Sequence, residues 1–190
     1  MRRKIRNRKQ LVTESERSNA ARAVFSALEC TAAFMMANRI LMYHSLPDEL
    51  STLEFLDKWH SRKQFFLPRV NGADLELLPY ERASLRPGAF RIEEPTEGTP
   101  VNPEEMELII VPAVALDRKG NRLGRGKGFY DRLLATTKAT TVGVAYDFQL
   151  LDELPVEPHD TPVHIVITES HRLVTRQSEH GRYKEHGYQR

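Results

Sequence analysis

The sequence predicts an α/β domain with a mostly parallel sheet flanked by helices, and three observations lead to that prediction. Residues 107–146 read as strand, loop, short helix and strand, which is one βαβ crossover and implies parallel strands. Other short apolar runs alternate with helical patterns along the rest of the chain. A length of 190 residues, with 40% hydrophobic and 28% charged residues, fits one globular domain.

Residues 14–29 are expected to form the first long helix. Apolar side chains recur there at steps of three and four, which puts four of them on one face: Ala21, Val24, Phe25 and Leu28. Thr13 directly precedes the pattern and suits the N-cap position. The short apolar run at 39–44 is expected to follow as a buried strand.

A second helix and a hairpin complete the first half of the chain. Ser51 and Glu54 have the spacing of a capping box, which predicts a helix reaching Arg62 with three side chains turned inward, Leu53, Leu56 and Trp59. Residues 64–70 and 75–80 read as two strands separated by an Asn-Gly turn at 71–72. Residues 86–105, rich in proline and acids, are expected to form a long irregular connection that closes over a bound substrate.

The second half predicts the βαβ unit and one more strand. The expected order is strand Glu107–Leu116, loop Asp117–Gly128, helix Phe129–Lys138, strand Thr141–Tyr146, a proline-rich loop at 155–162 and strand His164–Thr168. The polar residues from His171 onward are expected to lie outside the core. The prediction is one domain over residues 1–170, with a basic arm at 1–10 and a polar tail at 171–190.

Cysteine content and hydropathy exclude several classes of protein. Cys30 is the one cysteine, which excludes an intramolecular disulfide framework and any multi-thiolate metal site. The apolar stretch Leu108–Leu116 is about half of what crosses a bilayer, and Pro112 interrupts it. No apolar segment follows the basic N-terminus, so no secretory signal is expected. We interpret the sequence as that of a soluble, cytoplasmic protein without a membrane partner.

Positive charge is concentrated at the N-terminus. Residues 1–10 contain six Lys or Arg and no acid, whereas the other residues contain 22 basic and 26 acidic side chains. Such an arm attracts the phosphate groups of nucleic acids, lipids or nucleotides. The alternative interpretation is a solvated helix start that only aids solubility.

The segment with the clearest chemistry is the glycine-rich loop that follows the strand of the βαβ unit. Gly124, Gly126 and Gly128 alternate there with Arg125 and Lys127, and a helix is expected to begin directly after them. Glycines let backbone N–H groups approach an anion, the cations neutralise it, and the start of the helix adds partial positive charge. The segment therefore predicts a phosphate-binding loop at the carboxyl end of a strand.

This loop matches neither of the two common phosphate-binding patterns. Its G-x-G-x-G spacing differs from the dinucleotide fingerprint, and it lacks the hydroxyl residue and the first glycine of a P-loop. A mobile hairpin tip is the alternative interpretation. Asp131, on the first turn of the expected helix, is either an acid favoured by the helix dipole or a Mg²⁺ ligand.

The loop resembles the signature of the 5-formyltetrahydrofolate cyclo-ligase family, also called 5,10-methenyltetrahydrofolate synthetases. The resemblance rests on the run Asn121-Arg-Leu-Gly-Arg-Gly-Lys-Gly-Phe-Tyr-Asp131. Weaker blocks occur in the family's order over residues 2–170: the basic start with Thr13-Glu-Ser-Glu16, Tyr43-His-Ser-Leu-Pro-Asp-Glu-Leu-Ser-Thr52, Phe66-Leu-Pro68, Glu94-Pro95, Gly143-Val-Ala-Tyr146 and Leu154-Pro-Val-Glu-Pro-His-Asp160.

The resemblance implies a fold similar to the ribose-5-phosphate isomerase and CoA-transferase group and a ligase that uses ATP and Mg²⁺. The implied reaction converts 5-formyltetrahydrofolate to 5,10-methenyltetrahydrofolate, with ADP and phosphate as products. It requires no protein nucleophile, so the residues would act by positioning and charge neutralisation. The expected partners are these small molecules, not nucleic acid, and the expected assembly is a monomer or a weak homodimer.

The resemblance also implies a role for particular residues. Arg125 and Lys127 would be catalytic. ATP would be bound by Arg2, Arg6, Arg122, Leu123, Gly124, Arg125, Gly126, Lys127, Gly128, Phe129 and Tyr130. The folate would contact His44, Glu49, Arg125, Gly126, Lys127, Gly128 and Phe129. The metal would be held by Asp131 and Asp160.

Three alternatives stay open at the level of sequence. A nucleic-acid-binding protein would use the basic arm and the Arg/Gly/Lys loop, although the rest of the chain is acidic and shows no nucleic-acid-binding motif. A phosphosugar isomerase or a CoA-transferase would use a related sheet. A non-catalytic folate- or nucleotide-binding relative would keep the motif without turnover.

Overall fold

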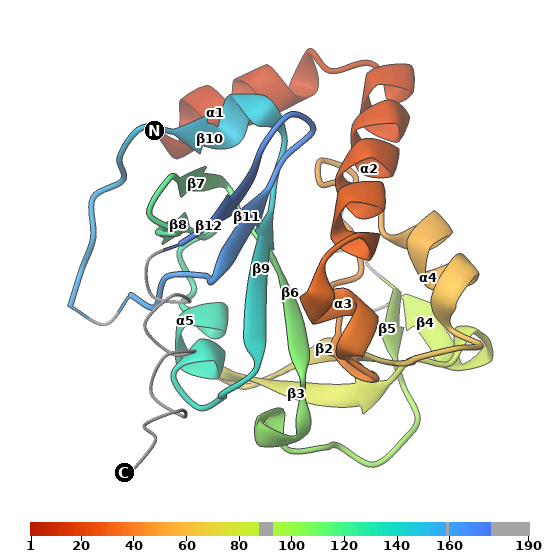
Figure 1. Cartoon of the computed structure of the whole chain (residues 1–190). Coiled ribbons are helices and arrows are strands. Elements are labelled where there is room, and N and C mark those ends of the chain that lie inside the picture. The colour runs from red at the N-terminus through yellow and green to blue at the C-terminus, as the bar shows by residue number, and fades with distance from the viewer. Residues whose placement is uncertain (88–92, 159, 176–190) are drawn as a thin grey trace, which may run out of the picture.

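A seven-stranded sheet forms the centre of the computed structural model, which describes residues 1–87, 93–158 and 160–175 (Figure 1). The strand order is β12-β11-β9-β6-β1-β2-β3. The five inner strands pair in parallel and comprise β1 (Arg39–Leu41), β2 (Gln64–Asn71), β6 (Leu108–Pro112), β9 (Thr140–Val144) and β11 (Ile165–Ile167). Antiparallel strands β3 (Asp74–Pro79) and β12 (Arg172–Val174) form the two edges. The predicted α/β fold with a mostly parallel sheet is confirmed.

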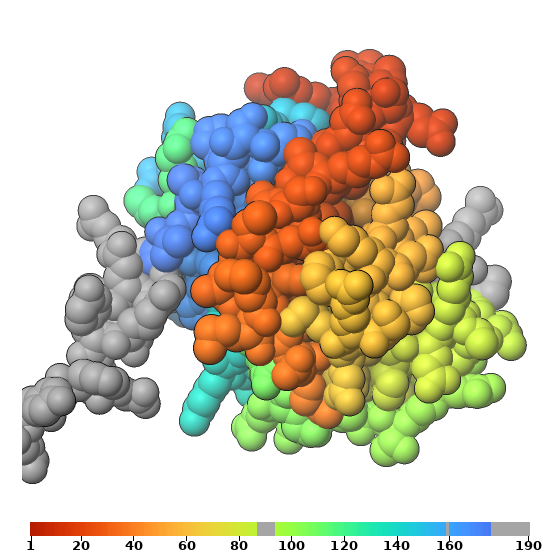
Figure 2. Space-filling view, turned by 45° about the vertical axis from the view of Figure 1, so that its right-hand side comes forward, coloured from red at the N-terminus to blue at the C-terminus, as the bar shows by residue number. Residues whose placement is uncertain are grey.

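Helices cover both faces of this sheet. One face carries α2 (Glu14–Glu29), α3 (Ala32–Met36) and α4 (Leu53–Trp59), which lie together in Figure 2. The opposite face carries α5 (Phe129–Leu134). Helix α1 (Arg2–Gln10) lies across one end of the molecule, where Ile5 packs with Ala115 and Leu154 (Figure 1).

The apolar run of β6 is explained by this covering of both faces. Ile110 points into the core beneath α2, whereas Ile109 and Val111 point into the core beneath α5. Successive strand residues face opposite sides, so a strand buried on both sides is apolar throughout. All three side chains are fully buried.

The helix at 14–29 and the hairpin follow the sequence prediction. The Thr13 hydroxyl accepts from the Glu16 amide at 3.3 Å, and the Glu16 carboxylate accepts from the Thr13 amide at 2.8 Å. This capping box fixes the start of α2. Strands β2 and β3 pair in register from Phe66↔Pro79 to Asn71↔Asp74, around a turn in which Gly72 has a φ of +61°.

The prediction of a capping box at Ser51 is wrong. Helix α4 begins at Leu53 after Thr52, whose side chain makes no capping hydrogen bond, and it ends at Trp59. Leu53 is exposed rather than inward, because Phe55 and Leu56 provide the buried face of this short helix.

The expected single strand 107–116 is divided. Strand β6 ends at Pro112, and β7 (Ala115–Asp117) joins a small separate sheet with β8 (Arg122–Leu123) and β10 (Leu150–Leu151). The chain turns because the Val114 amide donates to the Leu123 carbonyl and Gln149 donates to the carbonyls of Ala113 and Val114. The following helix α5 is also shorter than expected, ending at Leu134.

Two segments expected to be irregular contain regular structure. The 86–105 connection includes most of β4 (Leu85–Pro87), which pairs with β5 (Glu93–Pro95), and a 3₁₀ turn at Pro103–Glu105. Outside this connection, 3₁₀ turns occur at Arg82–Ser84 and Asp147–Gln149. Residues 171–175, assigned to the tail, include edge strand β12 and the buried Thr175. Residues 88–92 and 176–190 lie outside the described residues, and closure of the 86–105 connection stays a prediction.

Gly120 is expected to tolerate a side chain far less well than Gly72, although both have positive φ, +87° and +61°. A Cβ at Gly120 would lie 2.3 Å from the Val163 carbonyl oxygen, whereas one at Gly72 would meet nothing within 4 Å. Gly72→Ala should cost about 1 kcal/mol for the left-handed backbone. Gly120→Ala should cost at least about 2 kcal/mol more, because the backbone at Val163 must move. Urea unfolding measures both; equal midpoints would contradict the packing assigned to Gly120.

Candidate active site

A cavity of about 620 Å³ opens where the loops after β1 and β6 meet the β2–β3 hairpin. Pro68, Val70 and Leu75 of the hairpin form an apolar wall. The opposite walls come from Tyr43–Glu49, Pro112–Val114 and the glycine-rich loop. Because β1 and β6 are parallel neighbours, their carboxyl ends lie side by side, which is where α/β sheets place their ligands.

The glycine-rich loop borders this cavity as the sequence predicts. Gly126 has a φ of +99° and open space where a Cβ would stand, and Gly128, with a φ of +68°, is the N-cap residue of α5. Such φ values are accessible mainly to glycine, so the two positions shape the loop. The side chains of Arg125 and Lys127 on either side of Gly126 are exposed and line the cavity.

Arg125 joins the glycine-rich loop to the loop after β1. Its guanidinium donates to the Asp48 carboxylate at 2.7 Å and to the Glu49 carboxylate at 3.1 Å. The second oxygen of Glu49 accepts from the Leu46 amide at 3.0 Å, which fixes the carboxylate. Burial favours a higher pKa for Asp48, but Lys9 and Arg125 more than offset it and hold the pKa below its ordinary value. Predicted phosphate and folate residues thus meet at one point.

A second ion pair joins two other predicted residues. Arg122 donates to the Asp131 carboxylate at 2.6 Å, and the Arg122 side chain is only 5% exposed. The guanidinium also lies 5.6 Å from the centre of the Tyr130 ring. A buried charge of this kind requires its partner. Asp131 is therefore held at the cavity wall by Arg122.

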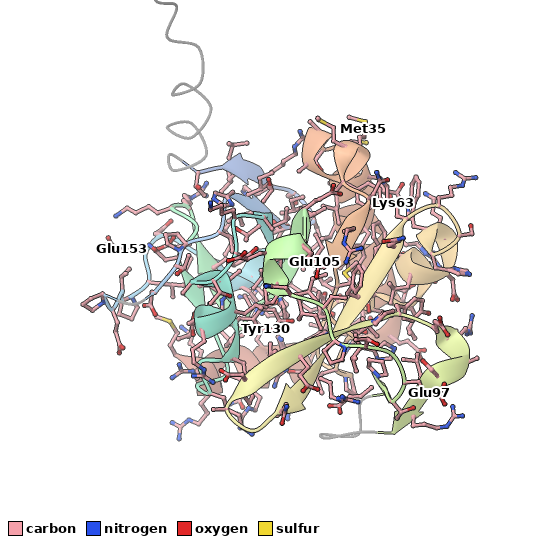
Figure 3. The ribbon with its side chains drawn as sticks, turned by 90° about the horizontal axis from the view of Figure 1, so that it is seen from below. Met35, Lys63, Glu97, Glu105, Tyr130 and Glu153 are labelled. Atoms are coloured by element: carbon pink, nitrogen blue, oxygen red, sulfur yellow. The ribbon has the colours of Figure 1, made fainter. Side chains whose placement is uncertain are left out.

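Two buried polar atoms of this wall make no hydrogen bond within the described part of the chain, the Tyr130 hydroxyl and Arg122 Nε. Figure 3 shows Tyr130 beside the β2–β3 hairpin, and both residues line the cavity. Burial and the nearby Glu49 charge raise the pKa of Tyr130 well above its ordinary value, so the hydroxyl keeps its proton. Buried donors without partners are costly, and a bound molecule could satisfy them.

The basic N-terminal arm forms α1, which brings cations to the same place. Arg2 donates to the Gly124 carbonyl at 2.9 Å. Arg2, Arg6 and Lys9 line a small hollow of about 60 Å³ that also contacts Asp48 and Arg125. The predicted Arg2 and Arg6 are thus near the glycine-rich loop.

Sequence reasoning missed Lys9 and Asp48. One signal could have indicated Lys9: together with Arg2 and Arg6 it follows the i, i+4, i+7 spacing of one helix face. Asp48 precedes the predicted Glu49 but carries no pattern of its own, and only the fold places it against Arg125.

The two predicted metal ligands occupy different environments. Asp131 lines the cavity, whereas Asp160 lies outside its described lining, in the loop before β11, where its carboxylate accepts from the Glu157 amide at 2.8 Å. Within residues 1–87, 93–158 and 160–175, no three His, Cys, Asp or Glu side chains cluster as a metal site. Asp131 fits a Mg²⁺ that takes further ligands from phosphate and water, and the role of Asp160 stays a prediction. His44 lies at the cavity wall, as predicted.

A wider groove of about 720 Å³ lies between α2 and α4 and shares His44, Leu46 and Glu49 with the cavity. Its rim consists of ion pairs that satisfy each other, Arg22 with Glu54 and Lys58 with Glu29. It contains no residue of the glycine-rich loop, so we assign the chemistry to the smaller cavity.

A glycine-rich loop, converging cations and a carboxylate at the carboxyl edge of a parallel sheet are features typical of α/β enzymes that act on phosphate-bearing substrates. The model of the 5-formyltetrahydrofolate cyclo-ligase family matches residues 1–169, and the chain belongs to that family. The sequence resemblance is thereby confirmed.

Curated relatives match most of the chain. The 5-formyltetrahydrofolate cyclo-ligase of Escherichia coli K12 is 31% identical over 176 residues, covering 87% of this chain and 97% of the relative. That of Mycolicibacterium smegmatis is 38% identical over 141 residues, covering 68% and 71%. The solved 5,10-methenyltetrahydrofolate synthetase of Aquifex aeolicus is 37% identical with a TM-score of 0.86, covering 98% of this chain and 95% of that one.

A synthetase of the same name from Mycoplasma pneumoniae shares the fold, with a TM-score of 0.71 at 21% identity over 89% of this chain and 96% of that one. In the described part of the chain, no helix has the length and apolar character needed to cross a membrane.

Loss of the Arg122–Asp131 pair is expected to destabilise the protein. Arg122→Met should cost about 3 kcal/mol, near the lower limit for a broken buried pair, because Asp131 keeps some contact with water. The matched control is Arg118→Met, whose side chain is 54% exposed and 3.9 Å from an exposed Asp152, and it should change stability by less than about 0.5 kcal/mol. Urea unfolding distinguishes them, and equal losses would show that Arg122 holds no special pair.

Proposed function

We propose that this protein is a 5-formyltetrahydrofolate cyclo-ligase that uses ATP. It converts 5-formyltetrahydrofolate to 5,10-methenyltetrahydrofolate and releases ADP and phosphate. The observation that carries the proposal is the contact of Arg125 with Glu49 at 3.1 Å, because it joins the proposed phosphate-binding residue to the proposed folate-binding carboxylate in one cavity. Family membership and the names of the relatives support it.

The reaction proceeds in two displacement steps. The formyl oxygen attacks the γ-phosphorus of ATP, the bond to ADP breaks, and an N5-iminium phosphate forms. N10 then attacks the activated carbon, loses its proton, and phosphate leaves with the former formyl oxygen. Neither step needs a covalent bond to the enzyme, so the protein contributes positioning and stabilisation of the charge on the phosphoryl group.

The cavity offers suitable groups for each substrate. Arg125 and Lys127 would contact the transferring phosphoryl group, and the open space beside Gly126 leaves room for it. Further ATP contacts would come from residues of the cavity and the small hollow, Arg2, Arg6, Arg122, Gly124, Gly128, Phe129 and Tyr130. The predicted Leu123 is not among the lining residues of either, because its side chain packs against the cluster of Ile5, Ala115 and Leu154. Glu49 would accept hydrogen bonds from the pterin amino and ring N–H groups, with His44 and Phe129 beside it. The apolar hairpin wall suits a flat ring.

Mg²⁺ fits the donor set at Asp131. A carboxylate at the cavity wall, next to the loop proposed to hold the phosphates, is the kind of ligand that Mg²⁺ takes in nucleotide sites. Bound there, the ion would neutralise negative charge on ATP. Asp160 is proposed as the second carboxylate, from the loop before β11.

The structure gives no comparable support to a nucleic-acid-binding arm. Lys9 is buried against Asp48 and Arg2 donates to the Gly124 carbonyl, so these two cations make contacts within the protein, whereas Arg3, Lys4, Arg6 and Arg8 are exposed. We further propose a cytoplasmic monomer or weak homodimer, which size-exclusion chromatography at several protein concentrations would test.

Lys127→Ala is expected to lower the rate of methenyl formation by about 100-fold or more, because removing one charged donor from a phosphoryl-transfer site has effects of this size. The absorbance of 5,10-methenyltetrahydrofolate is followed after mixing the protein with 5-formyltetrahydrofolate and MgATP. Lys138→Ala, at an exposed lysine outside the cavity, is the matched control and should retain full activity. A wild-type protein that binds both substrates without ATP-dependent product would be a binding-only relative.

Glu49→Gln is expected to raise the KM for 5-formyltetrahydrofolate about tenfold, the effect of weakening charged hydrogen bonds to the pterin. Glu153→Gln is the control, since Glu153 is exposed and pairs with the exposed Lys119, and its KM should stay within about twofold of wild type. Steady-state kinetics with varied folate at saturating MgATP give both values. An unchanged KM in Glu49→Gln would remove Glu49 from the folate site.

A further inference from the structure

Lys9 is buried to an unusual degree for a lysine. It lies on the inner side of α1 with 4% of its surface exposed, and lysines are rarely buried unless paired. Its ammonium lies 3.5 Å from one carboxylate oxygen of Asp48, a long contact for an ion pair. Burial lowers the pKa of Lys9, and the nearby Asp48 and Glu49 charges oppose this effect without cancelling it.

Asp48 is shared between two cations. Its oxygen Oδ2 faces Lys9, while its oxygen Oδ1 accepts from Arg125 at 2.7 Å. Arg125 in turn contacts Glu49. Two cations and two carboxylates thus form one balanced network, in which Arg125 has the shorter contact and Lys9 the longer one.

Arg17 of α2 holds both sides of the Lys9–Asp48 pair. Its guanidinium donates to the carbonyls of Lys9 at 2.9 Å and Val12 at 3.1 Å, at the end of α1. It also donates to the carbonyl of Pro47, the residue before Asp48. Arg17 therefore holds together the two backbone segments that carry Lys9 and Asp48, by contacts that do not involve Arg125.

A phosphate that binds Nη2 of Arg125 would displace Asp48, because this nitrogen donates to the Asp48 carboxylate at 2.7 Å. Asp48 is half-buried, and a partly desolvated carboxylate without a counter-ion is costly. That cost would reduce the free energy gained when the phosphate binds. Lys9 is the cation that is already in place to offset it.

We propose that Lys9 is a positioning residue that allows Arg125 to exchange Asp48 for a phosphate group of ATP, by remaining behind as the counter-ion of Asp48. The inference rests on the proposed function, in which Arg125 binds ATP. It assigns Lys9 a role through Asp48 and Arg125 rather than a contact with the nucleotide.

Binding of MgATP by isothermal titration calorimetry tests this in a double-mutant cycle. Lys9→Met should raise the Kd for MgATP about tenfold, with kcat for methenyl formation within about threefold of wild type. Adding Asp48→Asn should restore the Kd to within about threefold, because the neutral amide needs no counter-ion and releases Arg125 easily. Coupled residues give such non-additive effects.

The matched control cycle uses Lys4→Met with Asp48→Asn. Lys4 lies on the same helix but is exposed, and removing it changes the net charge by the same amount. Effects in this cycle should be additive. Lys9→Gln is the second variant if Lys9→Met does not fold, as judged by urea unfolding.

Three results would overturn the inference: an unchanged Kd in Lys9→Met and Lys9→Gln, additive effects in the Lys9 cycle, or equal coupling in both cycles. Wild-type protein that binds MgATP without forming product would disprove the proposed function alone, because the cycle is read from binding. Wild-type protein that does not bind MgATP would disprove both.

Discussion

Parallel pairing of β1 with β6 is the constraint on which the candidate site depends. The register Ile40↔Leu108 and Leu41↔Ile109 makes both strands end at the same edge of the sheet. The loop after β1 carries Asp48 and Glu49, and the chain after β6 carries the glycine-rich loop. Residues 77 positions apart in sequence, such as Asp48 and Arg125, meet because the backbone hydrogen bonds of two short strands bring their loops together.

Opposite charges in the cavity are paired between different structural elements, β8 with α5 and the glycine-rich loop with the loop after β1. Arg125 holds Glu49, and Arg122 holds Asp131. In each pair, an arginine proposed to bind ATP contacts a carboxylate with another proposed ligand. Glu49 would bind the folate, and Asp131 would bind the metal ion. The cavity therefore keeps nearly balanced charge, and the exposed cations are Arg125 and Lys127. Substrates would compete with protein carboxylates for the paired cations.

Local signals predicted the elements whose formation depends on local interactions. The capping box at Thr13 and the periodicity of α2 gave correct bounds, and the Asn-Gly turn gave the hairpin. The same capping-box spacing gave a wrong prediction of the N-cap at Ser51, because the burial of Phe55 and Leu56 decides where α4 begins. The break between β6 and β7 and the edge strand β12 depend on distant partners, Gln149 and β11, which no local pattern reveals. At the site, the glycine motif identified one wall, whereas Asp48 and Lys9 required the fold.

The strand order also bears on how the chain folds during its synthesis. After β1, β2 and β3 have formed one end of the sheet, each later strand of that sheet adds at the same edge in chain order, first β6, then β9, β11 and β12. Parallel strands joined by long crossovers have high contact order and fold slowly, which leaves unpaired strand edges exposed for longer. Because this sheet grows in one direction, the exposed edge at each stage is the one that the next strand covers. The glycine-rich loop lies between β6 and β9. The nascent chain can therefore assemble the walls of the cavity before its last two strands have left the ribosome.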